Sequence, residues 1–263
     1  MTDADLIVLD IDGGMLLHDC LESIRMQTVA PSRTIVFDNG SRTPVSERAS
    51  DVEIIRSETN LGFTGGVNAA YAETTAPYVA LVNNDVVLDR DWLATVIEAM
   101  DADATLAAVQ TIIRRDAQTI DGAGIDISDG TFRQIGHGLA IGTELPEAWG
   151  ISATAALYRK SALGANIFDE KFFAYYEDVE LSARLREGGW RLRVVPVVKA
   201  THRGSQSAAR VDARRLRTRN RYRVARAHPG VGRVRSLLWE DIKLMMRGRS
   251  SWRGMWEGLW DRS

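Results

Sequence analysis

Short apolar runs rich in β-branched residues alternate with segments of helical period along the first half of the chain, and this alternation most constrains its fold. Runs at 6–11, 34–37, 53–55, 78–82 and 106–113 are predicted to be strands. Leu17, Cys20, Leu21 and Ile24 have the spacing of one buried helix face, and 91–100 repeats this pattern. The chain is therefore predicted to be an α/β protein with a mostly parallel central sheet flanked by helices, in a βαβαβ nucleotide-binding layout. Ligands of such sheets bind at the carboxyl ends of the strands, so functional residues are expected just after them.

The second half of the chain is less regular. Residues 114–148 are Gly-rich and weakly periodic, which predicts a loop or hairpin insertion. Regularity returns with predicted strands at 150–158 and 192–198 and predicted helices at 177–187, 212–227 and 234–246. We therefore expect a nucleotide-binding domain at 1–207 and a C-terminal helical extension at 208–263.

The formal net charge of −2 conceals a strong asymmetry between body and extension. From residue 203 onward there are 16 Lys or Arg against 5 Asp or Glu, so this segment carries about +11 and the remainder about −13. The same segment carries Trp239, Trp252, Trp256 and Trp260. Indole rings beside basic side chains suit an anionic membrane surface. Packing on the body, or on a second subunit as in a homodimer, explains them equally well, and no nucleic-acid partner is expected.

Cysteine content and the N-terminal residues bear on location. A single cysteine, Cys20, excludes an internal disulfide and a cysteine zinc cluster, which fits a reducing compartment. Acidic residues precede the first short apolar run, unlike a secretory signal, and no stretch approaches the roughly 18 apolar residues of a spanning helix. A cytoplasmic location is expected, with peripheral attachment to the membrane if the extension binds lipid.

Two Gly-containing segments follow predicted strands. Asp38, Asn39, Gly40 and Ser41 place a carboxylate where it could accept hydrogen bonds from a nucleobase, although this sequence is also a good generic turn. The segment 60–68, with Asn60, Gly65 and Gly66, leads into a helix whose N-terminal N–H groups could face a phosphate. It lacks the ending of a Walker loop and is compatible with many nucleotide binders.

Asn83, Asn84 and Asp85 end the apolar strand at 78–82 and offer the hard oxygen ligands that Mg²⁺ or Mn²⁺ prefers. Asp85 is the expected direct ligand, and the alternative is a strand-ending turn. His202 follows the strand at 192–198, where it could supply a metal nitrogen or contact a diphosphate. A lone histidine can equally have a structural role.

The segment 168–178 combines an aromatic run with two acidic residues, Glu177 and Asp178. In a helix starting there, Asp178 shares a face with Leu181 and Leu185, so its carboxylate should point inward. Burial would raise its pKa toward the range of a general base, and the aromatic run could line a sugar-sized cleft. The competing interpretation is an acidic residue favoured by the helix dipole, which applies equally to Glu177.

Together and in this order, these segments resemble the family 2 glycosyltransferases of the GT-A fold, above all the bacterial rhamnosyltransferase-like members. The resemblance extends from about Leu6 to Ser207 and is most specific at 38–41, 60–68, 83–85 and 168–190. It implies an inverting transfer of a sugar from a nucleoside-diphosphate sugar to a hydroxyl group of a glycan or lipid-linked acceptor. The donor that it favours is dTDP-rhamnose.

The resemblance also implies roles for single residues. Asp38 would contact the base, Asp85 would bind the Mg²⁺ or Mn²⁺ ion with His202 beside it, and Asp178 would be the catalytic base. The other residues expected at the nucleotide sugar are Asp10, Asn39, Asn60, Gly65, Gly66, Asn84 and Trp190. No cofactor beyond the ion is implied.

Two positions depart from the family pattern. Family members usually follow the first strand with Tyr-Asn, whereas this chain has Asp10, Ile11, Asp12 and Gly13, so an aromatic contact with the nucleoside is in doubt. Asn83 replaces the first Asp of the Asp-x-Asp equivalent, which leaves one fewer charge for the metal. Two alternatives stay open: a sugar-phosphate nucleotidyltransferase, whose Gly-rich basic signature is missing after the first strand, and a non-catalytic scaffold that keeps the fold.

Overall fold

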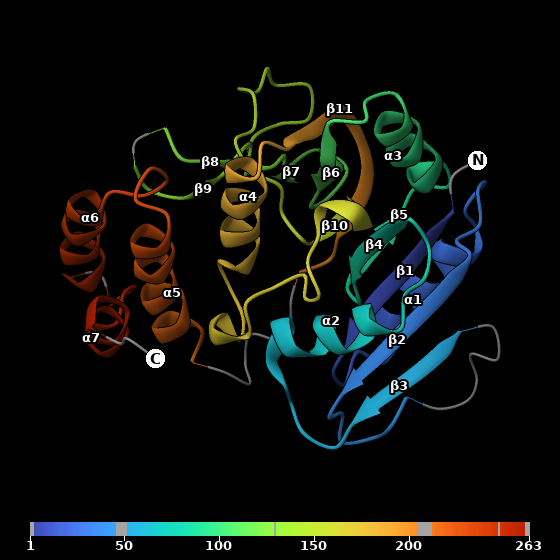
Figure 1. Ribbon diagram of the computed structural model, residues 1–263, viewed down its shortest axis with the longest axis horizontal. Helices are drawn as coiled ribbons and strands as arrows, with labels where there is room; N and C mark the ends of the chain where they lie inside the picture. Colours follow the sequence, from blue (N-terminus) through green and yellow to red (C-terminus); the bar gives the residue numbers. More distant parts are fainter. Residues whose placement is uncertain (1–2, 46–51, 129, 205–211, 247, 261–263) are drawn as a thin grey trace.

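The computed structural model describes residues 3–45, 52–128, 130–204, 212–246 and 248–260. A curled nine-stranded sheet forms its centre, in the order β3-β2-β1-β4-β10-β6-β11-β5 with β7 paired to β6 (Figure 1). Its strands are β1 (Ala4–Asp10), β2 (Arg33–Asn39), β3 (Glu53–Ser57), β4 (Tyr78–Asn83), β5 (Val86–Leu88), β6 (Leu106–Arg114), β7 (Ile120–Gly122), β10 (Ala155–Arg159) and β11 (Arg191–His202). A separate two-stranded sheet pairs β8 (Ile125–Asp126) with β9 (Arg133–Gln134).

Helices cover both faces of this sheet, as the apolar strands require. α1 (Met15–Arg25) and α3 (Trp92–Asp101) pack on one face, and α2 (Gly62–Ala72) and α4 (Glu177–Glu187) pack on the other. Successive residues of β1 and β4 join opposite clusters, because side chains alternate across a strand. The predicted α/β fold is confirmed, and the predicted buried face of α1 is buried in the structure.

The sheet is parallel only in part. The pairs of β1, β2, β3 and β4 are parallel as predicted, and β6 pairs with β11 in the same way, whereas β10 runs antiparallel between β4 and β6. The strand predicted at 150–158 begins only at Ala155. Apolar runs identify buried strands but do not fix their direction, which the path of the preceding insertion decides.

The insertion at 114–148 contains β7 and the β8-β9 hairpin, in agreement with the predicted loop or hairpin. β11 extends beyond its predicted end at 198 and includes His202, which pairs with Val86 of β5. His202 is therefore a strand residue rather than the start of a loop. Two short 3₁₀ helices, η1 (Lys160–Ala162) and η2 (Glu170–Phe172), precede α4.

The C-terminal extension is helical, as predicted, and docks on the body. It comprises α5 (Ala213–Ala227), α6 (Val234–Met246) and α7 (Trp252–Trp260), and the predicted boundary at 207/208 lies outside the described residues. Val224 of α5 packs with Ile125, Phe172 and Val179 of the body. Gly254 and Gly258 let α7 approach α5 closely: a Cβ atom at Gly254 would lie 2.4 Å from the carbonyl oxygen of Arg215.

The four tryptophans of the extension point away from this packing. Trp239, Trp252, Trp256 and Trp260 are each between 64% and 67% exposed. Packing on the body, one of the three explanations that the sequence leaves open, is therefore wrong for these side chains. Within the described part of the chain, no helix combines the length and apolar character that crossing a bilayer requires.

Candidate active site

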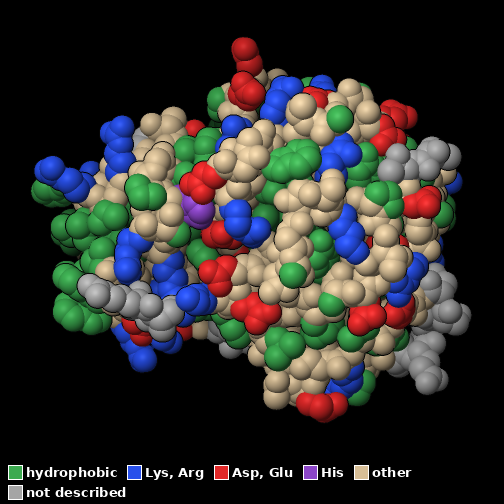
Figure 2. Space-filling view, in the orientation of Figure 1, with side chains coloured by type: hydrophobic (Ala, Val, Ile, Leu, Met, Phe, Trp, Pro, Cys, Tyr) green, Lys and Arg blue, Asp and Glu red, His purple; other side chains and the backbone are tan. Residues whose placement is uncertain are grey.

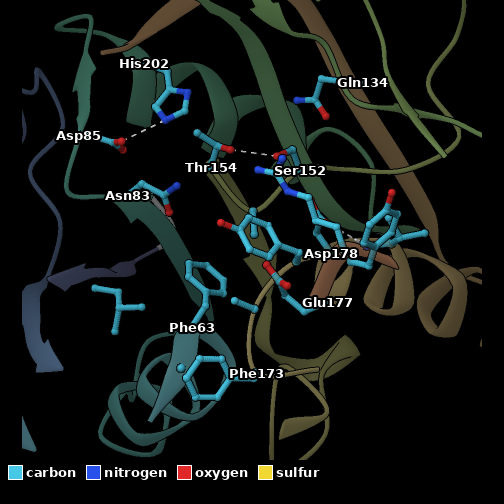
Figure 3. A pocket seen from close by; sticks show the side chains of 18 of the residues that line it. Phe63, Asn83, Asp85, Gln134, Ser152, Thr154, Phe173, Glu177, Asp178 and His202 are labelled. Atoms are coloured by element: carbon cyan, nitrogen blue, oxygen red, sulfur yellow. Dashed lines mark hydrogen bonds and ion pairs between the residues drawn. The ribbon is translucent and has the colours of Figure 1, made fainter. Parts of the chain in front are cut away.

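A cavity of about 820 Å³ opens at the carboxyl ends of β1, β2 and β4, the edge where the sequence predicts the ligand site. Its walls come from the strand ends, the insertion, the segment before α4 and one side chain of α5, Arg217. Figure 3 places Asp85 and His202 on one side of this cavity and Glu177 and Asp178 on the other, with Phe63 and Phe173 below.

Three predicted nucleotide-sugar residues, Asn39, Asn60 and Asn84, line the cavity. Asn39 organises its wall: its Nδ2 donates to the carbonyl oxygen of Gly62 at 2.9 Å, and its Oδ1 accepts from the N–H of Leu61 at 2.8 Å. Asn84 donates to Asp10 Oδ1 at 2.6 Å, and Asp10 is buried beneath the lining. Asp10 thus orients Asn84 and does not itself line the cavity.

Asp38 lies within β2 behind the cavity wall. Its carboxylate accepts hydrogen bonds from the N–H groups of Ser41 at 2.9 Å and Val45 at 3.1 Å and pairs with Arg56. Burial opposes its charge, but the hydrogen bonds from Ser41 and its other partners hold the pKa of Asp38 below its usual range. The partners of this carboxylate lie in the loop after β2 and on β3, and Asp38 is not among the residues that line the cavity.

Gly65, Gly66 and Trp190 also lie outside the lining. α2 begins at Gly62, so both glycines are helical residues rather than a loop ahead of the helix. A Cβ atom on Gly66 would lie 2.5 Å from Leu9 and 3.2 Å from Phe37, so this glycine serves the packing of α2 on the sheet. Trp190 is half-buried against the core below α2 and α4.

His202 lies between two carboxylates at the other end of the cavity. Its Nε2 is 3.2 Å from Asp85 Oδ2, and its Nδ1 is 2.7 Å from Asp121 Oδ2. Burial disfavours the imidazolium, but the two carboxylates outweigh burial and raise the pKa of His202 to about 10. Asp121, on β7, lies in the insertion at 114–148, and nothing in its local sequence pattern relates it to a histidine 81 positions away.

These groups fit a divalent ion that also binds phosphate oxygens. Asp85 Oδ1 is buried and has no hydrogen-bond partner among the described residues, which leaves one carboxylate oxygen available. The described residues contain no cluster of three or more His, Cys, Asp or Glu side chains arranged as a complete metal site. Mg²⁺ is commonly bound through one or two carboxylates together with substrate phosphates, so Asp85 and His202 suit it only together with a diphosphate.

Glu177 and Asp178 form the first turn of α4. Burial raises the pKa of Asp178, against the hydrogen bonds that its carboxylate accepts, among them one from the N–H of Val179 at 2.8 Å. Burial also raises the pKa of Glu177, and the neighbouring charge of Asp178 adds to the effect. Glu177 Oε2 has no partner among the described residues. Two adjacent carboxyl groups therefore face the cavity with elevated proton affinity, as a general base at neutral pH requires.

Comparison with known proteins agrees with this geometry. The sequence pattern of Glycosyl transferase family 2 matches residues 15–165, more than half of the chain. The chain belongs to glycosyl transferase family 2. It is a glycosyltransferase of the nucleotide-sugar-dependent kind, and the alternative of a nucleotidyltransferase is not favoured.

Among curated proteins, this glycosyltransferase is similar to the N-acetylglucosaminyl-diphospho-decaprenol L-rhamnosyltransferase of Mycobacterium tuberculosis. The two are 26% identical over 250 residues, which cover 82% of this chain and 81% of the relative. The resemblance to rhamnosyltransferases that the motifs indicate is thus confirmed over most of the sequence.

Solved structures share its fold. The mannosyltransferase PcManGT from Pyrobaculum calidifontis, in complex with GDP-Man and Mn²⁺, aligns over 100% of this chain and 90% of its own, with a TM-score of 0.60 and 16% identity. S. aureus TarS 1-349 in complex with UDP-GlcNAc aligns over 86% of this chain and 65% of its own, with a TM-score of 0.61 and 18% identity. The fold is that of GT-A glycosyltransferases, as the sequence predicts.

Proposed function

We propose that this glycosyltransferase is a metal-dependent, inverting enzyme in which Asp178 is the catalytic base. The observation that carries the proposal is the presence, in one cavity, of Asp178 and of the Asp85 and His202 pair on its far side. Asp178 would accept the proton of an acceptor hydroxyl group as that oxygen attacks the anomeric carbon of the donor. A single displacement from the side opposite the nucleotide inverts the configuration at that carbon.

The leaving nucleoside diphosphate would lie at the Asp85 end of the cavity. Asp85 and His202 Nε2 would hold Mg²⁺ or Mn²⁺, with release of the proton that His202 carries without the ion, and the bound ion would neutralise negative charge on the departing diphosphate. Asp121 would hold His202 from its other nitrogen, since a partner at one ring nitrogen fixes the orientation of the other. PcManGT, which shares the fold, was solved with Mn²⁺ and a nucleotide sugar.

Donor and acceptor follow from the rhamnosyltransferase relative and from the motifs. We take dTDP-rhamnose as the donor and a lipid-linked glycan as the acceptor, because the name of that relative specifies both rhamnosyl transfer and a decaprenol-linked acceptor. Asn39, Asn60 and Asn84 would contact the nucleotide, and the rings of Phe63, Phe173 and Tyr175 would border the sugar.

A lipid-linked acceptor calls for a membrane-facing surface, and the extension offers one. Its large apolar side chains that are exposed, among the described residues, are Trp239, Ile242, Met246, Trp252, Trp256 and Trp260, hereafter the tryptophan surface. Exposed basic residues lie at 235, 243 and 253 on the same two helices and at 249 between them, and none of the described Asp or Glu between 233 and 260 is exposed. Figure 2 shows hydrophobic side chains gathered over α6 and α7 at the left edge, with Lys and Arg beside them. We propose that the protein is cytoplasmic and attaches to an anionic membrane through this surface.

A calorimetric titration tests the metal and the nucleotide together. dTDP should bind the wild type in Mn²⁺ and lose most of its affinity in chelator, and Asp85→Ala should abolish the difference between the two conditions. Incubating the wild type with dTDP-rhamnose and a polyprenyl-diphosphate glycan, then determining the anomeric configuration of the product, tests the reaction. Equal dTDP affinity with and without metal, or a product that retains the donor configuration, would contradict the proposal.

A further inference from the structure

The segment between η2 and α4 has an unusual backbone. Phe173, Tyr175 and Tyr176 have φ angles of 63°, 70° and 68°, in a region that residues other than glycine rarely adopt. Glu177 and Asp178 follow immediately, so the direction in which Asp178 enters the cavity depends on this turn at 173–176. A backbone of this kind persists only where its surroundings hold it.

A single side chain of the extension meets three carbonyl groups of this segment. Asn220, fully buried on α5, points its Nδ2 at the carbonyl oxygens of Phe172 at 2.9 Å, Ala174 at 2.8 Å and Tyr175 at 2.7 Å. Its Oδ1 accepts from Arg219 Nε at 2.8 Å, so the amide is fixed with its donor group toward the turn. Among the described residues, the carbonyl groups of Ala174 and Tyr175 have Asn220 as their hydrogen-bond donor, whereas that of Phe172 also accepts from Arg219.

Two further contacts hold the turn, one from α2 on its opposite side and one on the ring of Tyr175. The carbonyl oxygen of Phe173 accepts from the N–H of Thr64 in the first turn of α2, at 3.2 Å. The guanidinium group of Arg217, one turn before Asn220 on α5, lies 4.4 Å from the centre of the Tyr175 ring and borders the cavity. The turn is therefore enclosed between α2 of the body and α5 of the extension.

We infer that Asn220 is a positioning residue for sugar transfer, which holds the turn at 173–176 so that the carboxylate of Asp178 meets the acceptor hydroxyl group. The inference rests on the proposed function, because it gives Asn220 a task in the same reaction. It makes α5 a structural part of the active site, although α5 lies beyond the nucleotide-binding domain that the sequence predicts at 1–207.

Two variants of Asn220 and one matched control test this role. Asn220→Ala removes the donor, and Asn220→Asp places a carboxylate oxygen against three carbonyl oxygens. The control is Thr218→Ala on the same helix: Thr218 is also buried, but its hydroxyl group contacts Ser250 and Ser251 of the segment before α7 and not the turn. Asn220→Asp should lower kcat about 10²-fold, since displacing a reacting group by about 1 Å costs about that much, and Asn220→Ala should lower it less. dTDP affinity should stay at the wild-type value in both Asn220 variants. Thr218→Ala should keep the wild-type kcat even if it is less stable than the wild type.

Hydrogen exchange of the backbone amides at 172–180 gives a readout that does not require activity. Both Asn220 variants should exchange faster than the wild type in this segment and at the wild-type rate in the central strands, and Thr218→Ala should not change the segment. If Asn220→Asp fails to fold by circular dichroism, Asn220→Ala decides. Wild-type kcat or unchanged exchange at 172–180 in Asn220→Ala overturns the inference. A wild type that transfers no sugar contradicts the proposed function instead, and the exchange measurement then still decides whether Asn220 holds the turn.

Discussion

The two buried carboxyl groups at the start of α4 oppose stability at the residue scale when they are charged. Burial raises the pKa of both Glu177 and Asp178, so the native state keeps protons that the unfolded chain has already released. This difference spans the range from the ordinary carboxyl pKa values up to the raised ones. The free energy of unfolding therefore falls as pH rises through that range.

Replacing Asp178 by Asn separates these two effects. Asp178→Asn should lower kcat about 10²- to 10⁴-fold, because the proposed general base is lost while its volume remains. Its dTDP affinity should be unchanged, and its melting temperature at pH 8 should equal or exceed that of the wild type, because a buried charge is gone. Initial rates, calorimetry and thermal unfolding check the three parts, and wild-type turnover in the purified variant would show that another residue is the base.

Glu177→Gln is the companion variant. Burial and the charge of Asp178 raise the pKa of Glu177 above that of Asp178, so Glu177 is still neutral when Asp178 loses its proton. Glu177→Gln should therefore keep turnover and leave the acid limb of the kcat profile at its wild-type pH. A variant as inactive as Asp178→Asn would assign the base to Glu177.

At the scale of single elements, local periodicity predicts well what tertiary contacts do not override. The helices α4 and α6 have the predicted bounds, because capping, turn residues and apolar spacing are local properties. The antiparallel direction of β10 and the helical place of Gly65 and Gly66 depend on contacts between distant segments. Asp121 reaches His202 through the sheet, and Asn220 reaches the turn through the docking of α5, so neither residue carries a signal in its own neighbourhood.

Gly62 joins two such elements and gives a test at this scale. It starts α2 with a φ of 77°, and a Cβ atom there would lie 2.5 Å from the carbonyl oxygen of Phe173. Gly62→Ala should therefore combine a strained backbone, which costs about 1–2 kcal/mol, with displacement of the turn before α4. In urea, the free energy of unfolding should fall by more than backbone strain alone would cost, and kcat should fall as well.

Gly142→Ala is the matched control for this test. Gly142 has a φ of 92° and nothing within 4 Å of its ideal Cβ position, so the substitution adds strain without a contact. Its stability loss should be the smaller of the two, and its kcat should match the wild type. If the two variants lose equal stability and both keep full activity, the contact between Gly62 and Phe173 has no part in the site.

At the scale of the whole molecule, the sequence divides into an acidic body and a basic extension, and this extension has two distinct surfaces. The extension contacts the turn at 173–176 with one side of α5 and presents the tryptophan surface on α6 and α7. Two copies joined symmetrically through this surface would bring its exposed cations together, since the described part of both helices has no exposed carboxylate to oppose them. An anionic bilayer would instead take up the indole rings in its interface and pair its lipid phosphates with the basic groups.

The membrane proposal is best tested by substitution, because truncation would remove the buried Leu237 and the Asp241 partner of Tyr222 and so destabilise α5. Trp256 and Trp260 are exposed neighbours with ring centres 5.7 Å apart, and replacing both by Ser should leave thermal stability unchanged. The wild type should sediment with vesicles that contain anionic phospholipid, less so as salt rises, and the double variant should lose most of this binding. Replacing Met15 and Met26, exposed apolar residues of the body, by Ser should have no effect. A wild type that ignores anionic vesicles at low salt, but whose sedimentation velocity reports a dimer that the double variant loses, would assign the tryptophan surface to a second copy of the chain.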